Sequence, residues 1–158
     1  MFYPRTVLRL TLIYVFDHIV FFLGLDSSLD IIFVVDGSAG VSEKLFSAMK
    51  QYVYQQVTTY NLSKDKIRVA FSTLGNSRQY SGLANGINNR QVFNILQALQ
   101  RSGGPRKIDV ELANIDSELN SGEFRSTVGK LVVLILAGRN FGGSTLLERP
   151  ASALRGMR

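Results

Sequence analysis

The chain carries three mainly apolar runs that predict buried β-strands. The runs cover Ile31–Val35, Ile67–Leu74 and Leu131–Leu136, and β-branched residues are frequent in all three. A strand that is apolar on both faces is typical of a parallel sheet covered by helices on each side. We therefore expect these runs to form the core of such a sheet.

Apolar residues at helical spacing lie between these runs and predict three helices. The first helix is expected from the N-cap Ser42 to about Tyr60. The second begins at a cap at Asn89, and the third covers Ile108–Leu119. The acidic residues of the third helix are expected to mark its solvated face; they are Asp109, Glu111, Asp116 and Glu118.

A short edge strand is expected around Arg78–Gly82, because the turn Gly75–Ser77 before it favours a hairpin. The element order is then strand, helix, strand, strand, helix, helix, strand. This order predicts an α/β fold with a doubly wound, mostly parallel sheet flanked by helices. The pattern stops after the fourth strand and predicts a truncated sheet. Its open edge would need a cover from the leader Ile13–Leu25 or from a partner chain, unless the chain folds poorly alone.

The chain divides into a leader (residues 1–29), a main domain (residues 30–143) and a loose basic tail (residues 144–158). In the leader, basic residues precede an apolar stretch that Asp17-His18 interrupts. Such a pattern is typical of a secretory signal or a membrane anchor. An extra docking helix and a non-native leader are the alternatives.

The composition agrees with one folded domain of 158 residues, of which 46% are apolar and 19% charged. The net charge of +6 is spread along the chain, which argues against a nucleic-acid-binding surface and leaves acidic glycans as candidate partners. The chain has no cysteine, and therefore no disulfide, thiolate metal site or cysteine nucleophile. Its one histidine, His18, lies in the leader, so a Ser-His-Asp hydrolase is not expected.

Asp36 and Ser38 follow the first predicted strand at its carboxyl end, where open α/β sheets place their ligand sites. The turn Gly37–Gly40 leads on to the first helix, but it matches neither the P-loop pattern nor the dinucleotide-binding pattern. A nucleotide-binding α/β enzyme is therefore an alternative only. Tyr52, Tyr54 and Tyr60 are candidates for a protein-contact face, and packing in the core and at the surface explains them equally well.

Several stretches of the main domain resemble the von Willebrand factor type A domain. The first strand and its loop read Asp-Ile-Ile-Phe-Val-Val-Asp-Gly-Ser, and the second strand begins Ile-Arg-Val-Ala-Phe-Ser. Gly103-Gly104 precedes the third helix, and the last strand continues into Ala-Gly138. The opening is especially similar to the amino-terminal modules of the type VI collagen α3 chain. The resemblance implies the same Rossmann-like fold.

Members of this family hold a divalent cation with three loops, and the resemblance implies that the site is degenerate here. Asp36 and Ser38 match two of the family's ligands. The other three positions hold residues without a suitable side-chain oxygen, which are Gly40, Arg106 and Ala137. Two protein ligands are too few to hold Mg²⁺ tightly, so no cofactor is expected, with Mg²⁺ as the alternative.

Without a cation, the carboxylate of Asp36 would need another positive partner. We hypothesise that Arg106, or the neighbouring Lys107, forms an ion pair with Asp36. The competing hypothesis is that Asp36-Gly37 is only a turn at the end of a strand and that Arg106 is solvated. In the metal-dependent alternative, Asp109 or water replaces the missing ligands.

The resemblance and the lack of a catalytic set predict a secreted, non-enzymatic module of the extracellular matrix. Such a module takes part in cell adhesion and is expected to bind matrix proteins such as collagens without a cation. The alternatives are a divalent-metal-dependent adhesion domain and the nucleotide-binding enzyme. Nucleic acid is not an expected partner, and membrane contact is expected only if the leader is an uncleaved anchor.

Overall fold

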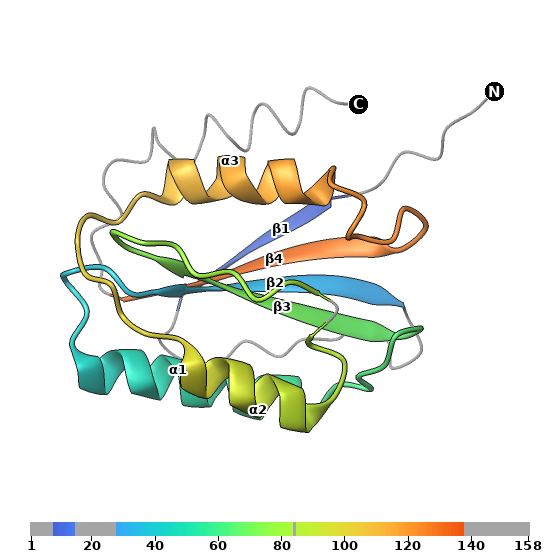
Figure 1. Cartoon of the computed structure of the whole chain (residues 1–158), viewed down its shortest axis with the longest axis horizontal. Helices are drawn as coiled ribbons and strands as arrows, with labels where there is room; N and C mark the ends of the chain where they lie inside the picture. Colours follow the sequence, from blue (N-terminus) through green and yellow to red (C-terminus); the bar gives the residue numbers. More distant parts are fainter. Residues whose placement is uncertain (1–7, 15–27, 84, 138–158) are drawn as a thin grey trace.

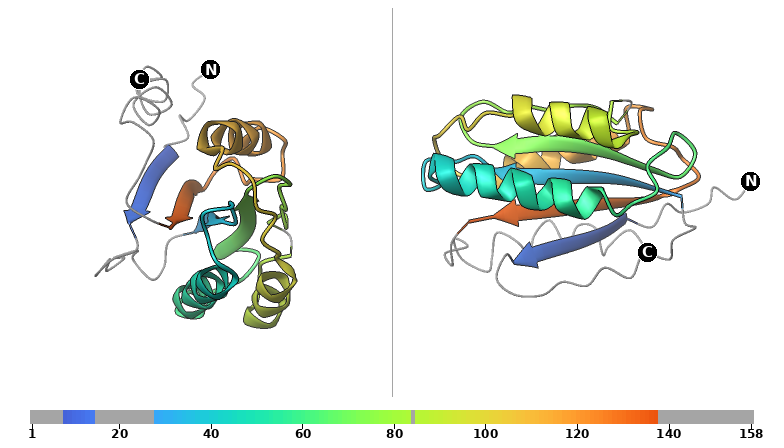
Figure 2. Two further views of the ribbon diagram at one scale, coloured as in Figure 1. Left: turned by 90° about the vertical axis from the view of Figure 1, so that its left-hand side faces the viewer. Right: turned by 90° about the horizontal axis from the view of Figure 1, so that it is seen from below.

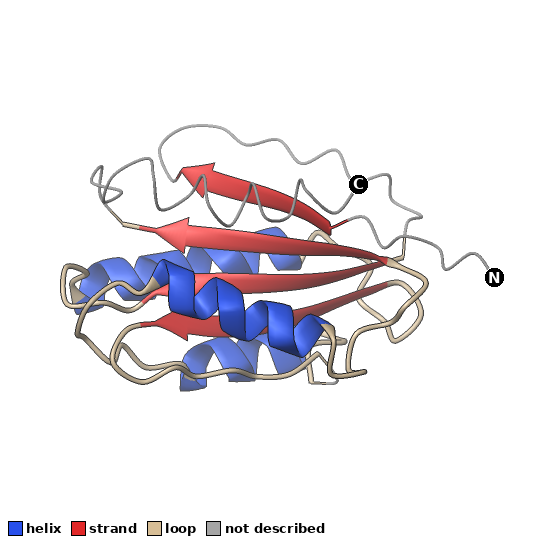
Figure 3. Cartoon of the chain, turned by 90° about the horizontal axis from the view of Figure 1, so that it is seen from above, coloured by secondary structure: helices blue, strands red, loops and turns tan. Residues whose placement is uncertain are grey.

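The computed structural model describes residues 8–14, 28–83 and 85–137 (Figure 1). The elements in chain order are β1 (Leu8–Tyr14), β2 (Leu29–Asp36), α1 (Glu43–Val57), β3 (Ile67–Leu74), α2 (Asn89–Ala98), α3 (Ile108–Leu119) and β4 (Gly129–Leu136). The four strands form one sheet in the order β1-β4-β2-β3, and every pair of neighbours is parallel (Figure 3). The carboxyl ends of all four strands therefore lie at the same edge of the sheet.

Helices cover both faces of the sheet: α1 and α2 lie on one face and α3 on the other (Figures 1 and 2). Alternate residues of a strand point to opposite faces, so each strand contributes to two separate cores. Ile31, Phe33 and Val35 pack with residues of α1 and α2. Ile32 and Val34 pack in the second core, beneath α3. This double burial explains the uniformly apolar strands and confirms the predicted α/β class.

The leader contributes a strand. β1 pairs in parallel with β4 over its whole length, from Leu8 opposite Lys130 to Tyr14 opposite Leu136. The docking-helix alternative is therefore wrong for Leu8–Tyr14. The leader does cover β4, but the covering segment begins at Leu8 and not at Ile13 as predicted. The alternation of leucine with polar residues in Leu-Arg-Leu-Thr-Leu is the signal that favours a strand here. Leader residues 1–7 and 15–27 lie outside the described residues, so the secretory signal or anchor stays a prediction.

Among the described residues, no helix has both the length and the apolar character needed to cross a membrane. The tail, residues 144–158, likewise lies outside the described part of the chain.

The helix boundaries differ slightly from the sequence predictions. Ser42 caps α1 as expected, accepting a hydrogen bond from the backbone N–H of Leu45 at 3.2 Å, but α1 ends at Val57. The cap of α2 is Asn88 rather than Asn89, since its side-chain oxygen accepts from the Gln91 N–H at 2.9 Å. Either of two adjacent asparagines can cap a helix, so the sequence alone does not determine at which one the helix begins.

The predicted edge strand Arg78–Gly82 is wrong. The segment forms only one isolated antiparallel bridge, between Ser72 and Tyr80. Beyond this bridge, side-chain oxygens take the place of backbone carbonyls as acceptors. Ser81 Oγ accepts from the Phe71 N–H at 2.9 Å, and Thr73 Oγ1 accepts from the Gln79 N–H at 3.0 Å.

Glu111 does not lie on a solvated face as expected. It is buried under α3, where its Oε1 accepts from Ser72 Oγ at 2.6 Å and its Oε2 accepts from Arg78 Nε at 2.7 Å. The prediction was wrong because Glu111 lies on the face of α3 that covers β3, where it contacts the polar residue Ser72. The carboxylate is satisfied there by a hydroxyl and a cation.

Asp30, at the amino end of β2, is a second fully buried carboxylate. Arg68 on β3 donates to both of its oxygens, at 3.0 and 2.8 Å. Arg125, before β4, donates to it through its backbone N–H, Nε and Nη2, at 3.0, 3.0 and 2.7 Å. Burial by itself would raise the pKa of Asp30, but the hydrogen bonds from the two arginines outweigh it and hold the pKa below its usual value. The cluster ties β2, β3 and the segment before β4 together.

We predict that Asp30→Asn lowers the free energy of unfolding at neutral pH by about 3 kcal/mol, because it leaves two arginines beside a neutral amide. A carboxyl whose pKa is lowered by folding stabilises the protein above its unfolded pKa and loses this effect as the pH falls through the folded value. The difference between wild type and variant should therefore be constant above about pH 5 and shrink only below about pH 4. Urea unfolding across this pH range measures it.

Asp65→Asn is the matched control, since Asp65 is an exposed carboxylate in the nearby turn. Its effect should stay within about 0.5 kcal/mol at neutral pH. Equal effects of the two substitutions at neutral pH would contradict a stabilising role for the Asp30 cluster.

Candidate functional site

Asp36 is the last residue of β2, and its side chain is fully buried at the carboxyl edge of the sheet. Its Oδ1 accepts from the backbone N–H of Ser38 at 3.1 Å. Its Oδ2 accepts from the backbone N–H of Ala137, the residue after β4, at 3.3 Å. Asp36 thus links the loop that follows β2 to the end of the neighbouring strand.

Arg106 supplies the positive charge beside this carboxylate. Its Nη2 lies 2.6 Å from Asp36 Oδ2 and donates to the carbonyl of Ala137 at 2.5 Å. The side chain of Arg106 is 20% exposed, whereas that of Asp36 is 0% exposed, so the pair is largely desolvated. The neighbouring Lys107 is exposed and makes no ion pair within the described residues. Of the two candidate cations, the structure brings Arg106 to Asp36.

The remaining predicted site residues lie in the loop between β2 and α1. Ser38 is buried, at 3% exposed, and Gly40 is exposed. A Cβ built on Gly40 would meet no atom within 4 Å. A serine would therefore fit at position 40, so packing does not explain the glycine there.

Backbone hydrogen bonds join this first loop to the segment between α2 and α3. The N–H of Ala39 donates to the carbonyl of Gly104 at 2.8 Å, and the N–H of Gly103 donates to the carbonyl of Gly37 at 2.9 Å. Gly103 and Gly104 have φ values of +68° and +74°, a conformation that strongly favours glycine. The two glycines bring Arg106 close to the end of β2.

A divalent cation does not fit this residue set. Mg²⁺ requires about six oxygens in octahedral array, and the predicted positions supply only the side chains of Asp36 and Ser38. A guanidinium already lies against the carboxylate. Asp109, the suggested substitute ligand, is exposed in the first turn of α3. Within the described ranges, no group of three or more His, Cys, Asp or Glu side chains could hold a metal ion.

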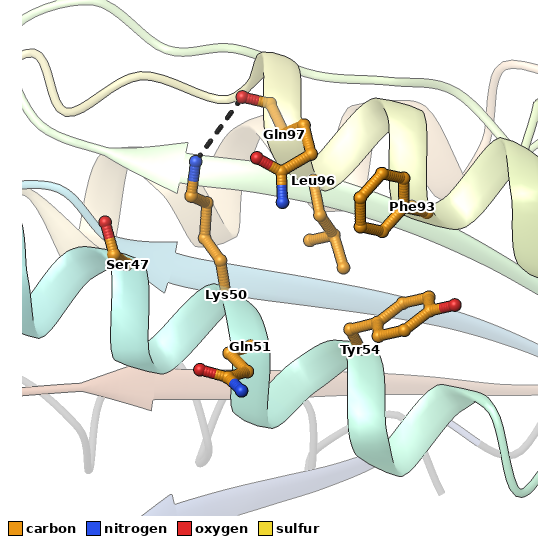
Figure 4. Close-up of a pocket in the computed structure, with 7 residues that line it drawn as sticks. All are labelled: Ser47, Lys50, Gln51, Tyr54, Phe93, Leu96 and Gln97. Atoms are coloured by element: carbon orange, nitrogen blue, oxygen red, sulfur yellow. Dashed lines mark hydrogen bonds between the residues drawn. The ribbon is translucent and has the colours of Figure 1, made fainter.

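A groove of about 420 Å³ runs between α1 and α2, on the flank of the sheet (Figure 4). Its lining is formed by Ser47, Lys50, Gln51, Tyr54, Phe93, Leu96 and Gln97. The rings of Tyr54 and Phe93 meet edge to face, 5.6 Å apart, and Phe93 is 45% exposed. The groove therefore presents part of the Phe93 ring to the solvent, with the partly buried Tyr54 beside it.

Lys50 closes one part of the groove by donating to the carbonyl of Leu99 at 2.8 Å, beyond the end of α2. Burial lowers the pKa of Lys50, against the opposing effect of Glu43. The sequence pattern predicts Tyr54 as a contact residue but does not identify Phe93. The signal for Phe93 is an aromatic residue that falls outside the apolar stripe of its own helix.

The sequence and the fold of this chain are similar to those of known proteins. The sequence profile of the von Willebrand factor type A domain matches residues 30–158. The human collagen alpha-5(VI) chain is 25% identical in a match of 113 residues that covers 69% of this chain and 4% of that one. The chain therefore spans only a small part of the curated relative that it matches.

Two solved structures share the fold. Proximal thread matrix protein 1 from the mussel byssus, solved with a zinc-occupied MIDAS motif, has a TM-score of 0.66 and 23% identity, over 84% of this chain and 34% of that chain. The manganese-loaded Plasmodium vivax TRAP protein has a TM-score of 0.66 and 18% identity, over 82% of this chain and 54% of that chain.

We predict that Arg106→Met lowers the free energy of unfolding by about 3 kcal/mol, because it leaves the buried carboxylate of Asp36 without a cation. Lys107→Met, one residue along, removes the same charge from an exposed side chain and should change stability by less than about 0.5 kcal/mol. Chemical denaturation of both variants gives the comparison. If the two substitutions have equal effects, the Asp36–Arg106 pair does not contribute to stability.

Proposed function

Because the chain belongs to the von Willebrand factor type A domain family, we propose that it is a non-enzymatic protein-binding module of a collagen-VI-like matrix protein that binds its partners without a cation. It acts in cell adhesion, is secreted, and its partners are extracellular matrix proteins such as collagens. The human collagen relative supports this assignment of compartment and partner class.

The observation that carries cation independence is the contact between Arg106 and Asp36. A guanidinium 2.6 Å from the carboxylate supplies the charge that a metal ion would otherwise supply. It is covalently attached, and its Nη2 contacts both Asp36 Oδ2 and the carbonyl of Ala137. Unlike a metal ion, it offers no open coordination position to an oxygen of a partner.

Two surfaces support partner binding in this proposal. One is the set of loops at the carboxyl edge of the sheet, around Ser38 and Gly40. The other is the α1–α2 groove, where Phe93 and Tyr54 present aromatic area of the kind enriched at protein interfaces.

A divalent-metal-dependent adhesion domain is the second candidate, favoured by the zinc and manganese in the two structural neighbours. A nucleotide-binding enzyme gains no comparable support. The close approach of the backbone explains Gly37, because a Cβ there would lie 2.9 Å from the carbonyl oxygen of Leu74. This glycine is accounted for by packing and not by a phosphate loop.

Binding of the full chain to immobilised collagens, measured in EDTA and in Mg²⁺, tests the proposal. Equal binding in both conditions is expected. A partner that binds only in Mg²⁺ would favour the metal-dependent candidate. Separately, the binding of Phe93→Ser in EDTA shows whether the α1–α2 groove contributes to binding.

We further predict that wild-type protein shows no rise in melting temperature with Mn²⁺, because a ligand stabilises only a state that binds it. The triple variant Gly40→Ser, Arg106→Thr, Ala137→Asp restores three oxygen donors and should be stabilised by Mn²⁺. In EDTA this variant should be less stable than wild type, because a second carboxylate then lies beside Asp36 without a cation. Stabilisation of the wild type by Mn²⁺ would contradict the prediction.

A further inference from the structure

The turn between α1 and β3 contains the sequence Asn61-Leu62-Ser63. This is the acceptor pattern for Asn-linked glycosylation, in which the middle residue is not proline. No other asparagine of the sequence has Ser or Thr two residues later. We propose that Asn61 carries an Asn-linked oligosaccharide, an inference that rests on the secreted location proposed above.

The side chain of Asn61 is available for modification. Asn61 is exposed, and among the described residues no hydrogen bond involves its side-chain amide. Other asparagines differ, because the amides of Asn85 and Asn120 donate to the carbonyls of Ser81 and Asp116. Replacing a hydrogen of the Asn61 amide by a sugar therefore breaks no contact.

The turn that presents Asn61 is held by its backbone. The carbonyl of Asn61 accepts from the N–H of Ile67 at 3.3 Å. The carbonyl of Lys64 accepts from Arg125 Nη1 at 3.2 Å, and that of Asp65 accepts from Ser28 Oγ at 2.8 Å. Since none of these bonds uses the Asn61 side chain, a large glycan can project into solvent while the turn keeps its shape.

The position of the turn keeps a glycan away from the Asp36 site. Asn61 lies between α1 and β3, on the side where β3 begins, whereas Asp36 is the last residue of β2, at the carboxyl edge. The strands between these edges have eight residues each, a length of about 25 Å. An oligosaccharide on Asn61 would shield the amino edge of the sheet and leave the loops at the carboxyl edge open to a partner.

The modification is a group transfer from a lipid-pyrophosphate-linked oligosaccharide, the activated donor of the secretory pathway. Asn61 Nδ2 forms a bond to the anomeric carbon of the first sugar, and the bond from that carbon to the pyrophosphate oxygen breaks. The lipid pyrophosphate leaves with the bonding electrons, and the amide nitrogen gives up one proton. The hydroxyl of Ser63 completes the acceptor pattern; in the folded chain it accepts from the Lys66 N–H at 3.1 Å.

The test expresses the full chain in cultured secretory cells with a carboxyl-terminal tag that carries its own Asn-x-Thr acceptor. Treatment with peptide-N-glycosidase, followed by mass spectrometry, counts the glycans and converts each modified asparagine to aspartate. Wild type should carry two glycans, one on the tag and one on Asn61. Asn61→Gln should carry one, and Ser63→Thr should keep two because it preserves the pattern. Asn94→Gln, an exposed asparagine without the pattern, is the matched control and should keep two.

The tag separates failure of this inference from failure of the proposed function. If the tag is glycosylated and Asn61 is not, the proposal for Asn61 is wrong, and the proposed secretion is still supported. If the tag is also unmodified, the chain has not entered the secretory pathway and its proposed location is wrong. The same chain with a heterologous secretory signal in front then decides Asn61 separately: modification at Asn61 supports the site, and a modified tag alone overturns it.

Discussion

A buried carboxylate needs a positive partner, and the central strand β2 carries one such carboxylate at each end. Asp30 and Asp36 are both fully buried, because β2 lies between two neighbouring strands and beneath helices on both faces. Leaving either charge unpaired would cost several kcal/mol. The chain meets this requirement with arginines from distant segments, Arg68 and Arg125 at one end and Arg106 at the other. These pairs fix the connecting loops to the strand ends.

The pair at the carboxyl edge defines the chemistry of the candidate site. Its cation belongs to the chain itself, so the positive charge beside Asp36 cannot dissociate as a metal ion can. Arg106 also donates to the carbonyl of Ala137 and therefore joins three loops at once. A module built in this way offers shape, hydrogen bonds and aromatic surface to its partners, and these are the properties of the loops and of the α1–α2 groove.

β4 and β3 would both be open edge strands of a three-stranded sheet, and a different segment of the chain covers each of them. Beside β4 the leader supplies β1, which pairs along the full strand. Beside β3 the segment around Tyr80 covers the backbone with one bridge and several side-chain hydrogen bonds. Both solutions satisfy backbone groups that would otherwise be open to pairing with another chain. Neither needs a regular hairpin, which explains why the predicted strand Arg78–Gly82 is absent.

The sequence by itself determined the three mainly apolar strands β2, β3 and β4, the three helices and the parallel α/β class, because burial on both faces and helical spacing are local patterns. The resemblance to the family also predicted Asp36, Ser38, Gly40, Arg106 and Ala137 as the positions where the family's metal ligands are kept or lost, and this stays a prediction. Only the tertiary structure decided between Arg106 and Lys107, since that choice depends on the path of the Gly103-Gly104 turn. It likewise decided that Leu8–Tyr14 is a strand, that Glu111 is buried and that Asp30 has two arginine partners. Each of these depends on contacts between segments that lie far apart in the chain, and local sequence patterns do not specify such contacts.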